Sequence, residues 1–206
     1  IRRILGVIGL TLQFFTFAGA QDITISLSAR ESTNTPLLVR GQFDTERAAN
    51  ERHVLPFAES VAGVSGLRKR ITDIKLLDAN GMELTFVESS CCAIATGAIK
   101  QFSYTLSLDS TDGIRAEAHT SWLRNGNGVL MFGDIVPQEF GATGKRFSAA
   151  LTLDLPRDWL VRSSDLVAET KVLRTDDIGN AVAFVGGIWR VADIDIDGQI
   201  FKIVLS

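Results

Sequence analysis

Apolar and polar residues alternate with a period of two in several stretches of this chain. The clearest stretch spans residues 99–108, and a second spans Ile23–Ser28; in both, apolar side chains alternate with polar ones, mostly serine and threonine. Successive side chains of a strand point to opposite faces, so this period is typical of a strand with one buried side. The pattern predicts a protein built from half-buried strands.

Other strand predictions rest on shorter apolar or alternating runs bounded by turn residues. They cover Leu37–Phe43, Ile71–Leu77, residues 82–87, residues 129–132, residues 147–155, residues 182–185, residues 188–196 and Gln199–Leu205. The polar cluster at residues 31–36 predicts a turn, so we expect the first two strands to pair antiparallel. Asn80 and Gly81 predict a tight hairpin before residues 82–87.

Helical patterns are scarce. Residues 57–67 hold apolar residues at helix-like spacing but contain Gly63 and Gly66. An interior glycine costs about 1 kcal/mol relative to alanine, so either one short helix or a loop with a helical turn fits. Roughly ten strands against at most one or two short helices favour an all-β fold, a β-sandwich.

The N-terminus has the layout of a secretory signal peptide. Arg2 and Arg3 precede an apolar run at residues 4–17, and a small-residue sequence ends at Ala20. A membrane anchor is the alternative, but a spanning helix needs about 20 apolar residues. We therefore expect residues 1–20 to be removed on export to the periplasm or the extracellular space, with no stable membrane span afterwards. Residues 21–206 are then expected to form a single β-sandwich domain.

Charge argues against nucleic acid as a partner. Removing residues 1–20 takes away two arginines and no acid, which changes the net charge from −3 to −5. The longest basic run, Arg68-Lys69-Arg70, is too short for a nucleic-acid surface and is expected to be solvated.

Metal-binding residue types are few. The chain has two cysteines, the neighbours Cys91 and Cys92, and two histidines, His53 and His119. A disulfide between adjacent cysteines would restrain little of the unfolded chain. Tetrahedral zinc needs about four ligands, so we interpret the cysteines as structural or incidental and predict no metal residue.

An acidic motif near the C-terminus has two interpretations. Asp193, Asp195, Asp197 and Gly198 match the start of a helix-loop-helix calcium loop. Such a loop ends in a bidentate glutamate at its twelfth position, and Val204 stands there. A strand followed by an Asp-Gly hairpin turn explains the same residues.

Catalytic motifs are not apparent either. A Ser-His-Asp triad could use His53 or His119, but residues 63–66 lack the G-x-S-x-G spacing of a nucleophile elbow. Strand alternation would place His119 opposite Ala118 and Thr120. Residues 141–146 lack the glycine spacing and the hydroxyl of a phosphate-binding loop. The sequence thus predicts no catalytic, cofactor-binding or metal residue, and leaves open whether the parent protein is an enzyme.

Several patches resemble a known family. They are Ala-His-Thr-Ser-Trp-Leu at residues 118–123, Gly-Val-Leu-Met-Phe-Gly-Asp-Ile-Val-Pro-Gln at residues 128–138, and the stretches at residues 57–64, 71–81, 153–159 and 184–190. Together they cover most of the chain after residue 20. This part of the chain is similar to the N-terminal β-domain of glycyl-aminopeptidase-like gluzincin metallopeptidases.

The resemblance implies a multidomain exported enzyme in which the β-domain precedes a thermolysin-like zinc domain. That zinc domain carries His-Glu-x-x-His and a downstream glutamate ligand, and none of these positions has a match here. No catalytic or metal residue can therefore be assigned by resemblance. The zinc, and the catalytic domain as partner, are expected only outside this chain.

Two functions follow from these expectations. The first is a non-catalytic N-terminal β-domain that packs against a catalytic domain of the same parent chain or another protein domain. The alternative is a stand-alone exported β-sandwich that binds a protein or glycan at the cell envelope. An uncovered apolar surface would favour the first. Aromatic residues gathered on one face, with Trp122, Trp159 and Trp189 as candidates, would favour the second.

Overall fold

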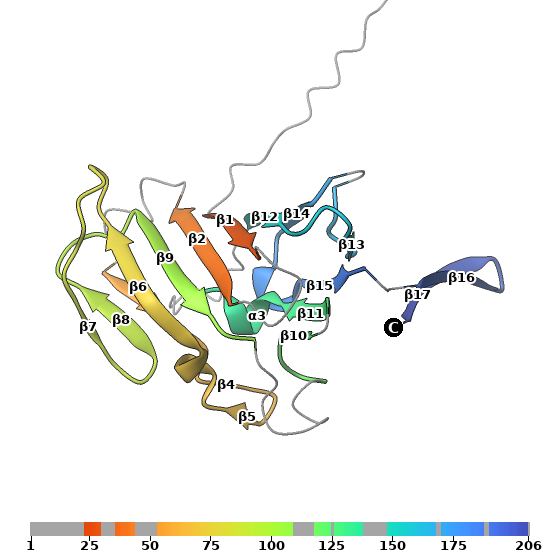
Figure 1. The fold of residues 1–206 in the computed structure, drawn as a ribbon, viewed down its shortest axis with the longest axis horizontal. Helices are drawn as coiled ribbons and strands as arrows, with labels where there is room; N and C mark the ends of the chain where they lie inside the picture. Colours follow the sequence, from red (N-terminus) through yellow and green to blue (C-terminus); the bar gives the residue numbers. More distant parts are fainter. Residues whose placement is uncertain are drawn as a thin grey trace, which may run out of the picture.

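The computed structural model is mostly β-strand (Figure 1). It describes residues 23–29, 36–43, 53–108, 118–124, 126–137, 148–167, 170–187 and 190–205. Helices within these ranges are single turns: α3 (Phe132–Ile135), η1 (Leu67–Arg70) and η2 (Ile178–Asn180). None has the length and apolar character needed to cross a membrane. The predicted all-β class is confirmed.

Some sequence predictions fall on other parts of the chain. The expected signal peptide at residues 1–20, most of the expected turn at residues 31–36, and residues 141–146 lie outside the described residues. Trp189 does as well.

The larger sheet has six strands in the order β14-β12-β1-β2-β9-β6. These are β1 (Ile23–Ser28), β2 (Leu37–Phe43), β6 (Ile71–Leu77), β9 (Gln101–Leu106), β12 (Ala149–Asp154) and β14 (Val172–Thr175). β1 pairs antiparallel with β2, as predicted, and parallel with β12 on its other side. In this sheet, β1, β2, β9 and β12 bury every second residue, which agrees with the alternation of apolar and polar residues in the sequence.

The second main sheet has four strands in the order β10-β11-β15-β13. These are β10 (Trp122–Arg124), β11 (Asn127–Met131), β13 (Leu160–Arg162) and β15 (Val182–Gly186). Buried residues of both main sheets, such as Leu27 and Val185, belong to one hydrophobic cluster. The two sheets therefore share a core, as a β-sandwich requires.

Three small sheets complete the fold. They consist of β3 (Val54–Pro56), β8 (Cys92–Ala95) and β7 (Phe86–Glu88); β4 (Ser60–Val61) and β5 (Val64–Ser65); and β16 (Arg190–Ile196) and β17 (Gln199–Leu205). The structure thus has more strands than the ten or so predicted. The additional ones, such as β3 and β13, are too short to carry a period-two signal of their own.

A glycine in β2 makes room for an aromatic ring of the core. Gly41 is the direct partner of Phe102 on β9, and the ring of Phe102 lies over it. A Cβ atom at position 41 would stand 2.1 Å from Cζ of Phe102. The same ring stacks on Tyr104, with 6.0 Å between the ring centroids. Because glycine has no side chain, it leaves room in this strand for the ring to pack closely against the backbone.

Two local predictions require correction. Between Phe57 and Arg70, the strands β4 and β5 form a hairpin and the single helical turn η1 follows it, so a helical turn is present but the residues before it form a hairpin and not a loop or a helix. Ala62 and Gly63, at the turn, have positive φ values of 48° and 86°, a conformation that favours a two-residue hairpin turn. Residues 82–87 do return after the Asn80-Gly81 turn, but they meet β6 only at the single bridge Leu77–Glu83. β7 then pairs with β8 instead.

The β16–β17 ribbon extends away from both main sheets (Figure 1). Its turn is Asp197-Gly198, with φ values of 53° and 80°, so the predicted Asp-Gly hairpin is confirmed. All the side chains of β16 that the structure describes are exposed, including Ile194 at 41% and Ile196 at 54%. Within the described ranges, these two strands pair with each other and with no other strand.

Candidate functional site

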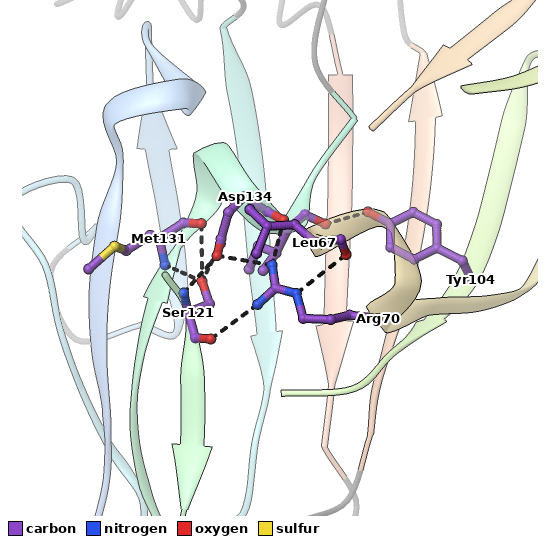
Figure 2. A network of polar contacts seen from close by, with 7 residues as sticks. Leu67, Arg70, Tyr104, Ser121, Met131 and Asp134 are labelled. Atoms are coloured by element: carbon purple, nitrogen blue, oxygen red, sulfur yellow. Dashed lines mark hydrogen bonds and ion pairs between the residues drawn. The ribbon is translucent and has the colours of Figure 1, made fainter. Parts of the chain in front are cut away.

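A cluster of buried polar contacts lies between the two main sheets (Figure 2). Arg70 comes from the end of η1, Ser121 precedes β10, and Asp134 belongs to α3. The side chain of Asp134 is 0% exposed and that of Arg70 is 8% exposed. Such burial of two charged groups is costly unless each finds a partner.

Arg70 provides that partner for Asp134. Its Nη2 donates to Oδ2 of Asp134 at 3.0 Å and to the carbonyl oxygen of Asp134 at 3.1 Å. Its Nη1 donates to the carbonyl oxygen of Ser121 at 3.3 Å. The guanidinium therefore joins η1, which leads into the six-stranded sheet, to segments that flank the four-stranded sheet.

Ser121 satisfies the rest of the carboxylate. Its backbone N–H donates to Oδ2 of Asp134 at 2.7 Å, and its Oγ donates to Oδ1 at 2.5 Å. The same Oγ accepts from the backbone N–H of Met131 at 2.7 Å. Both carboxylate oxygens are thus hydrogen-bonded. The hydroxyl proton of Ser121 is buried and points at a carboxylate, so this serine has a structural role and is not an exposed nucleophile. We call the three residues Arg70, Ser121 and Asp134 the clasp.

Tyr104 lies beside this clasp. Its hydroxyl donates to the carbonyl oxygen of Ile135, the last residue of α3, at 2.5 Å. Burial raises the pKa of Tyr104 far above its ordinary value, and the negative charge of Asp134 raises it further. The phenol is therefore held neutral, and it fixes α3 to the six-stranded sheet.

The basic triplet at residues 68–70 is not the solvated run that the sequence predicted. Lys69 is exposed, but Arg68 and Arg70 are buried. The Nη1 of Arg68 donates to the carbonyl oxygen of Ile71 at 3.0 Å, and its Nη2 pairs with the carboxylate of Glu88. The guanidinium carbon stands 5.1 Å from the ring centroid of Phe57, within the range of a cation–π contact. A 3₁₀ helix of four residues points these two arginines into the protein.

The remaining candidates do not form a catalytic site. His53 and His119 are both exposed. His119 lies in a turn at residues 118–120 rather than in a strand, so the alternation expected around it is wrong; β10 begins only at Trp122. Gly63 and Gly66 flank the short strand β5 and have positive φ values. No hydrogen bond links either histidine side chain to a described serine or aspartate.

Cys91 and Cys92 form a disulfide at the start of β8. Their carbonyl groups accept hydrogen bonds from the backbone N–H groups of Phe57, at 2.7 Å, and Ser89, at 2.8 Å. The bond closes no long loop of the chain. A structural role in this turn is therefore its simplest interpretation.

No three of the described His, Cys, Asp and Glu side chains gather in a way that could hold a metal ion. Asp195 instead stabilises the hairpin turn, since its Oδ1 accepts from the backbone N–H of Gly198 at 2.8 Å.

The tryptophans do not mark a binding face. Trp159 is buried in the core, and Trp122 is half-buried on β10. With Trp189 outside the described residues, the aromatic surface that would have favoured a stand-alone binding domain is not seen.

The sequence did not reveal the clasp itself. One signal was present: Asp134 interrupts the apolar run from Val129 to Val136, and an acid in such a run is rarely buried without a partner. Its partner Arg70 lies 64 positions away, and no local pattern connects the two.

Comparison with known proteins shows what this architecture resembles. No protein-family model matches the chain, and neither does any curated protein. Among solved structures, an aminopeptidase N family protein from Idiomarina loihiensis matches 89% of this chain and 32% of that chain, with a TM-score of 0.71 and 14% identity. An M1 zinc metallopeptidase from Deinococcus radiodurans, in a variant bound to a Tyr-Ser-Ala substrate, matches 90% of this chain and 46% of that chain, with a TM-score of 0.44 and 12% identity.

The first of these matches confirms the resemblance read from the sequence, at the level of the fold. The chain spans about a third of the length of that protein. Identity of 14% shows a shared architecture and not a shared activity. The described residues therefore have the fold of one part of an aminopeptidase N family protein.

Proposed function

We propose that this chain is a non-catalytic, exported β-domain of a zinc aminopeptidase-like protein, and that it packs against a catalytic domain through the β16–β17 ribbon. The observation that carries the proposal is the ribbon's uncovered apolar surface. Ile194 and Ile196 are exposed there at 41% and 54%. A domain that lacks its partner leaves such a surface open to water.

The ribbon has two chemically different faces. Ile194 and Ile196 alternate with Asp193 and Asp195 along β16, and successive side chains of a strand point to opposite sides. On β16, one face therefore carries the isoleucines and the other carries the aspartates. An isolated two-stranded hairpin is at best marginally stable in water. Packing the isoleucine face on a neighbouring domain would stabilise it and leave the aspartates solvated.

Other features support the proposal. The fold is shared with an aminopeptidase N family protein about three times as long as the matched part. The described buried groups of Arg70, Ser121 and Asp134 are used in holding the two sheets together, so these groups are not free for catalysis. The disulfide between Cys91 and Cys92 suits the oxidising compartment that export would provide.

The first test is to read the coding DNA past the codon for Ser206. We expect an open frame that reaches His-Glu-x-x-His within the following few hundred codons. A stop codon directly after Ser206 would overturn the proposal.

The second test locates the contact. Hydrogen exchange of the β16–β17 amides is expected to be fast in this chain alone and slowed at least tenfold in the full-length protein, because packing suppresses local opening. Ile194→Ser combined with Ile196→Ser should restore fast exchange in the full-length protein. Val87→Ser is the matched control, since Val87 is 71% exposed on β7 and lies outside the ribbon. Equal protection in the wild type and the double variant would contradict a contact through the isoleucines.

A further inference from the structure

The outer face of the six-stranded sheet carries a shallow groove lined by both polar and apolar groups. It has a volume of about 360 Å³ and crosses the central strands β1, β2 and β9 as far as the end of β6. Ligand sites have volumes of about 300–1,000 Å³, so the groove can hold a small molecule or part of a larger one. Arg40, Gln42, Gln101, Ser26 and Ser103 provide most of its polar lining.

The strand register brings these groups into rows. Arg40 on β2 is the direct partner of Ser26 on β1 and of Ser103 on β9. Ser103 is in turn the partner of Lys75 on β6. Directly opposed residues of neighbouring strands share a face of the sheet, with Cβ atoms about 5 Å apart. A cation flanked by two hydroxyl groups, with a second cation at the end of the row, therefore lies across the sheet.

A second row runs beside the first. Gln42 is the partner of Thr24 and of Gln101, and Gln101 is the partner of Leu77. Two side-chain amides, each able to donate and accept, thus neighbour the cation row. Among the residues that the structure describes, no acidic side chain lines the groove.

Several cations elsewhere in the fold are engaged by other groups of the protein. Arg70 and Arg68 are engaged by carboxylates, and Lys171 donates to the carbonyl oxygens of Leu155 and Pro156. Arg40 and Lys75, by contrast, make no hydrogen bond or ion pair with any residue that the structure describes. Their charges are available to a ligand.

We propose that this groove binds an acidic saccharide, a glycan whose sugar carries a carboxylate. The guanidinium of Arg40 would pair with the carboxylate, for which its planar fork is suited. The hydroxyls of Ser26 and Ser103 and the amides of Gln42 and Gln101 would exchange hydrogen bonds with sugar hydroxyls.

Other ligand classes fit the groove less well. A peptide that adds as a strand needs an open sheet edge, whereas β1, β2 and β9 are paired on both sides. Nucleic acid needs several cations that follow the phosphates, and the row across this sheet offers two, Arg40 and Lys75. The inference does not depend on the catalytic domain proposed above, so either proposal can fail without the other.

The test is calorimetric titration of the protein with oligogalacturonate at low salt, compared with a neutral maltooligosaccharide of equal length. We expect binding of the acidic sugar, at least tenfold weaker binding of the neutral one, and a loss of affinity as salt is added. No binding of oligogalacturonate, or equal binding of both sugars, would overturn the proposal.

Variants locate the site. Arg40→Ala should weaken binding of oligogalacturonate at least tenfold, whereas Arg157→Ala, which removes the same charge from an exposed turn, should not. Gln42→Trp should block the groove without changing its charge. Unchanged melting temperatures of all three variants would show that the fold is intact, as expected for exposed positions. Equal losses for Arg40→Ala and Arg157→Ala would show attraction to net charge alone and refute the groove.

Discussion

The junction between the two main sheets, where the clasp lies, and the β16–β17 ribbon differ in which side chains they bury. At the junction, the charged groups of Arg70 and Asp134 are buried and hydrogen-bonded. On the ribbon, Ile194 and Ile196 are 41% and 54% exposed. The first region buries charged groups that are paired within this chain, and the second exposes apolar side chains, against which we propose that a partner packs.

The largest effect is expected at the clasp. Arg70→Met leaves the carboxylate of Asp134 buried without its counter-charge, which should lower the free energy of unfolding by about 3–5 kcal/mol. Asp134→Asn should cost a similar amount, because it leaves the guanidinium of Arg70 buried without its counter-charge and replaces one accepting oxygen with a donor. Chemical denaturation of both variants and of the double variant measures the coupling between the two residues. Additive losses would mean that the buried pair does not act as a unit.

The packing of Gly41 against Phe102 should give the next largest effect. Gly41→Ala places a Cβ atom inside the ring of Phe102, and overpacking of this kind typically costs about 1–3 kcal/mol. Phe102→Leu should lose stability alone but should reduce the cost of Gly41→Ala when the two are combined. Thermal unfolding of the three variants is the measurement. A Gly41→Ala variant as stable as the wild type would show that the ring can move aside.

Tyr104 provides a pH test of the same junction. The fold raises its pKa, so the neutral phenol contributes stability that is complete below the unfolded value of about 10. This contribution is lost as the pH rises above that value, because the unfolded chain ionises first. Tyr104 is the only tyrosine of the chain. Tyrosinate absorbance should therefore appear together with alkaline unfolding, and not in the native protein before it.

A matched variant isolates the phenol. Tyr104→Phe should lose about 0.5–1.5 kcal/mol at neutral pH through its missing hydrogen bond. The variant should also lose less stability than the wild type between neutral pH and strongly alkaline pH. Early tyrosinate formation in the folded wild type would contradict the buried position of the hydroxyl.

The smallest effect is expected on the ribbon. Ile194→Ser and Ile196→Ser should change the unfolding free energy of this chain alone by no more than about 0.5 kcal/mol, because both side chains are already exposed. Denaturation curves of the single variants check this. A loss of several kcal/mol would mean that the isoleucines pack within the chain, and the contrast between the two regions would then disappear.

The sequence predicted the long strands well for a physical reason. β1, β2 and β9 each have one face in the core and one face in water. Apolar and polar residues therefore alternate along their sequences. β3, β8 and β13 are short, so they are defined by their pairing partners rather than by their own residues. The hairpin of β4 and β5 was not predicted, because the apolar residues in this segment have helix-like spacing. That spacing favoured a helical structure over a turn at Ala62 and Gly63.

The polar features were less predictable. Arg68 and Arg70 read as a surface run, yet their acidic partners Glu88 and Asp134 stand 20 and 64 positions away. The groove around Arg40 likewise depends on register among β1, β2, β9 and β6. Composition and local spacing contain no information on such pairings, so only the assembled fold brings these groups together.

The parallel pairing of β1 with β12 has a consequence for how the molecule must be synthesised. Ile23, on the first strand, is the partner of Ala149. Until β12 has left the ribosome, the strands β1, β2, β9 and β6 can form, but β1 remains an open edge. Unpaired edges recruit other chains, and distant pairings form slowly. Nascent chains that end before residue 149 should therefore aggregate, and a chaperone that shields extended segments would be of most use during that interval.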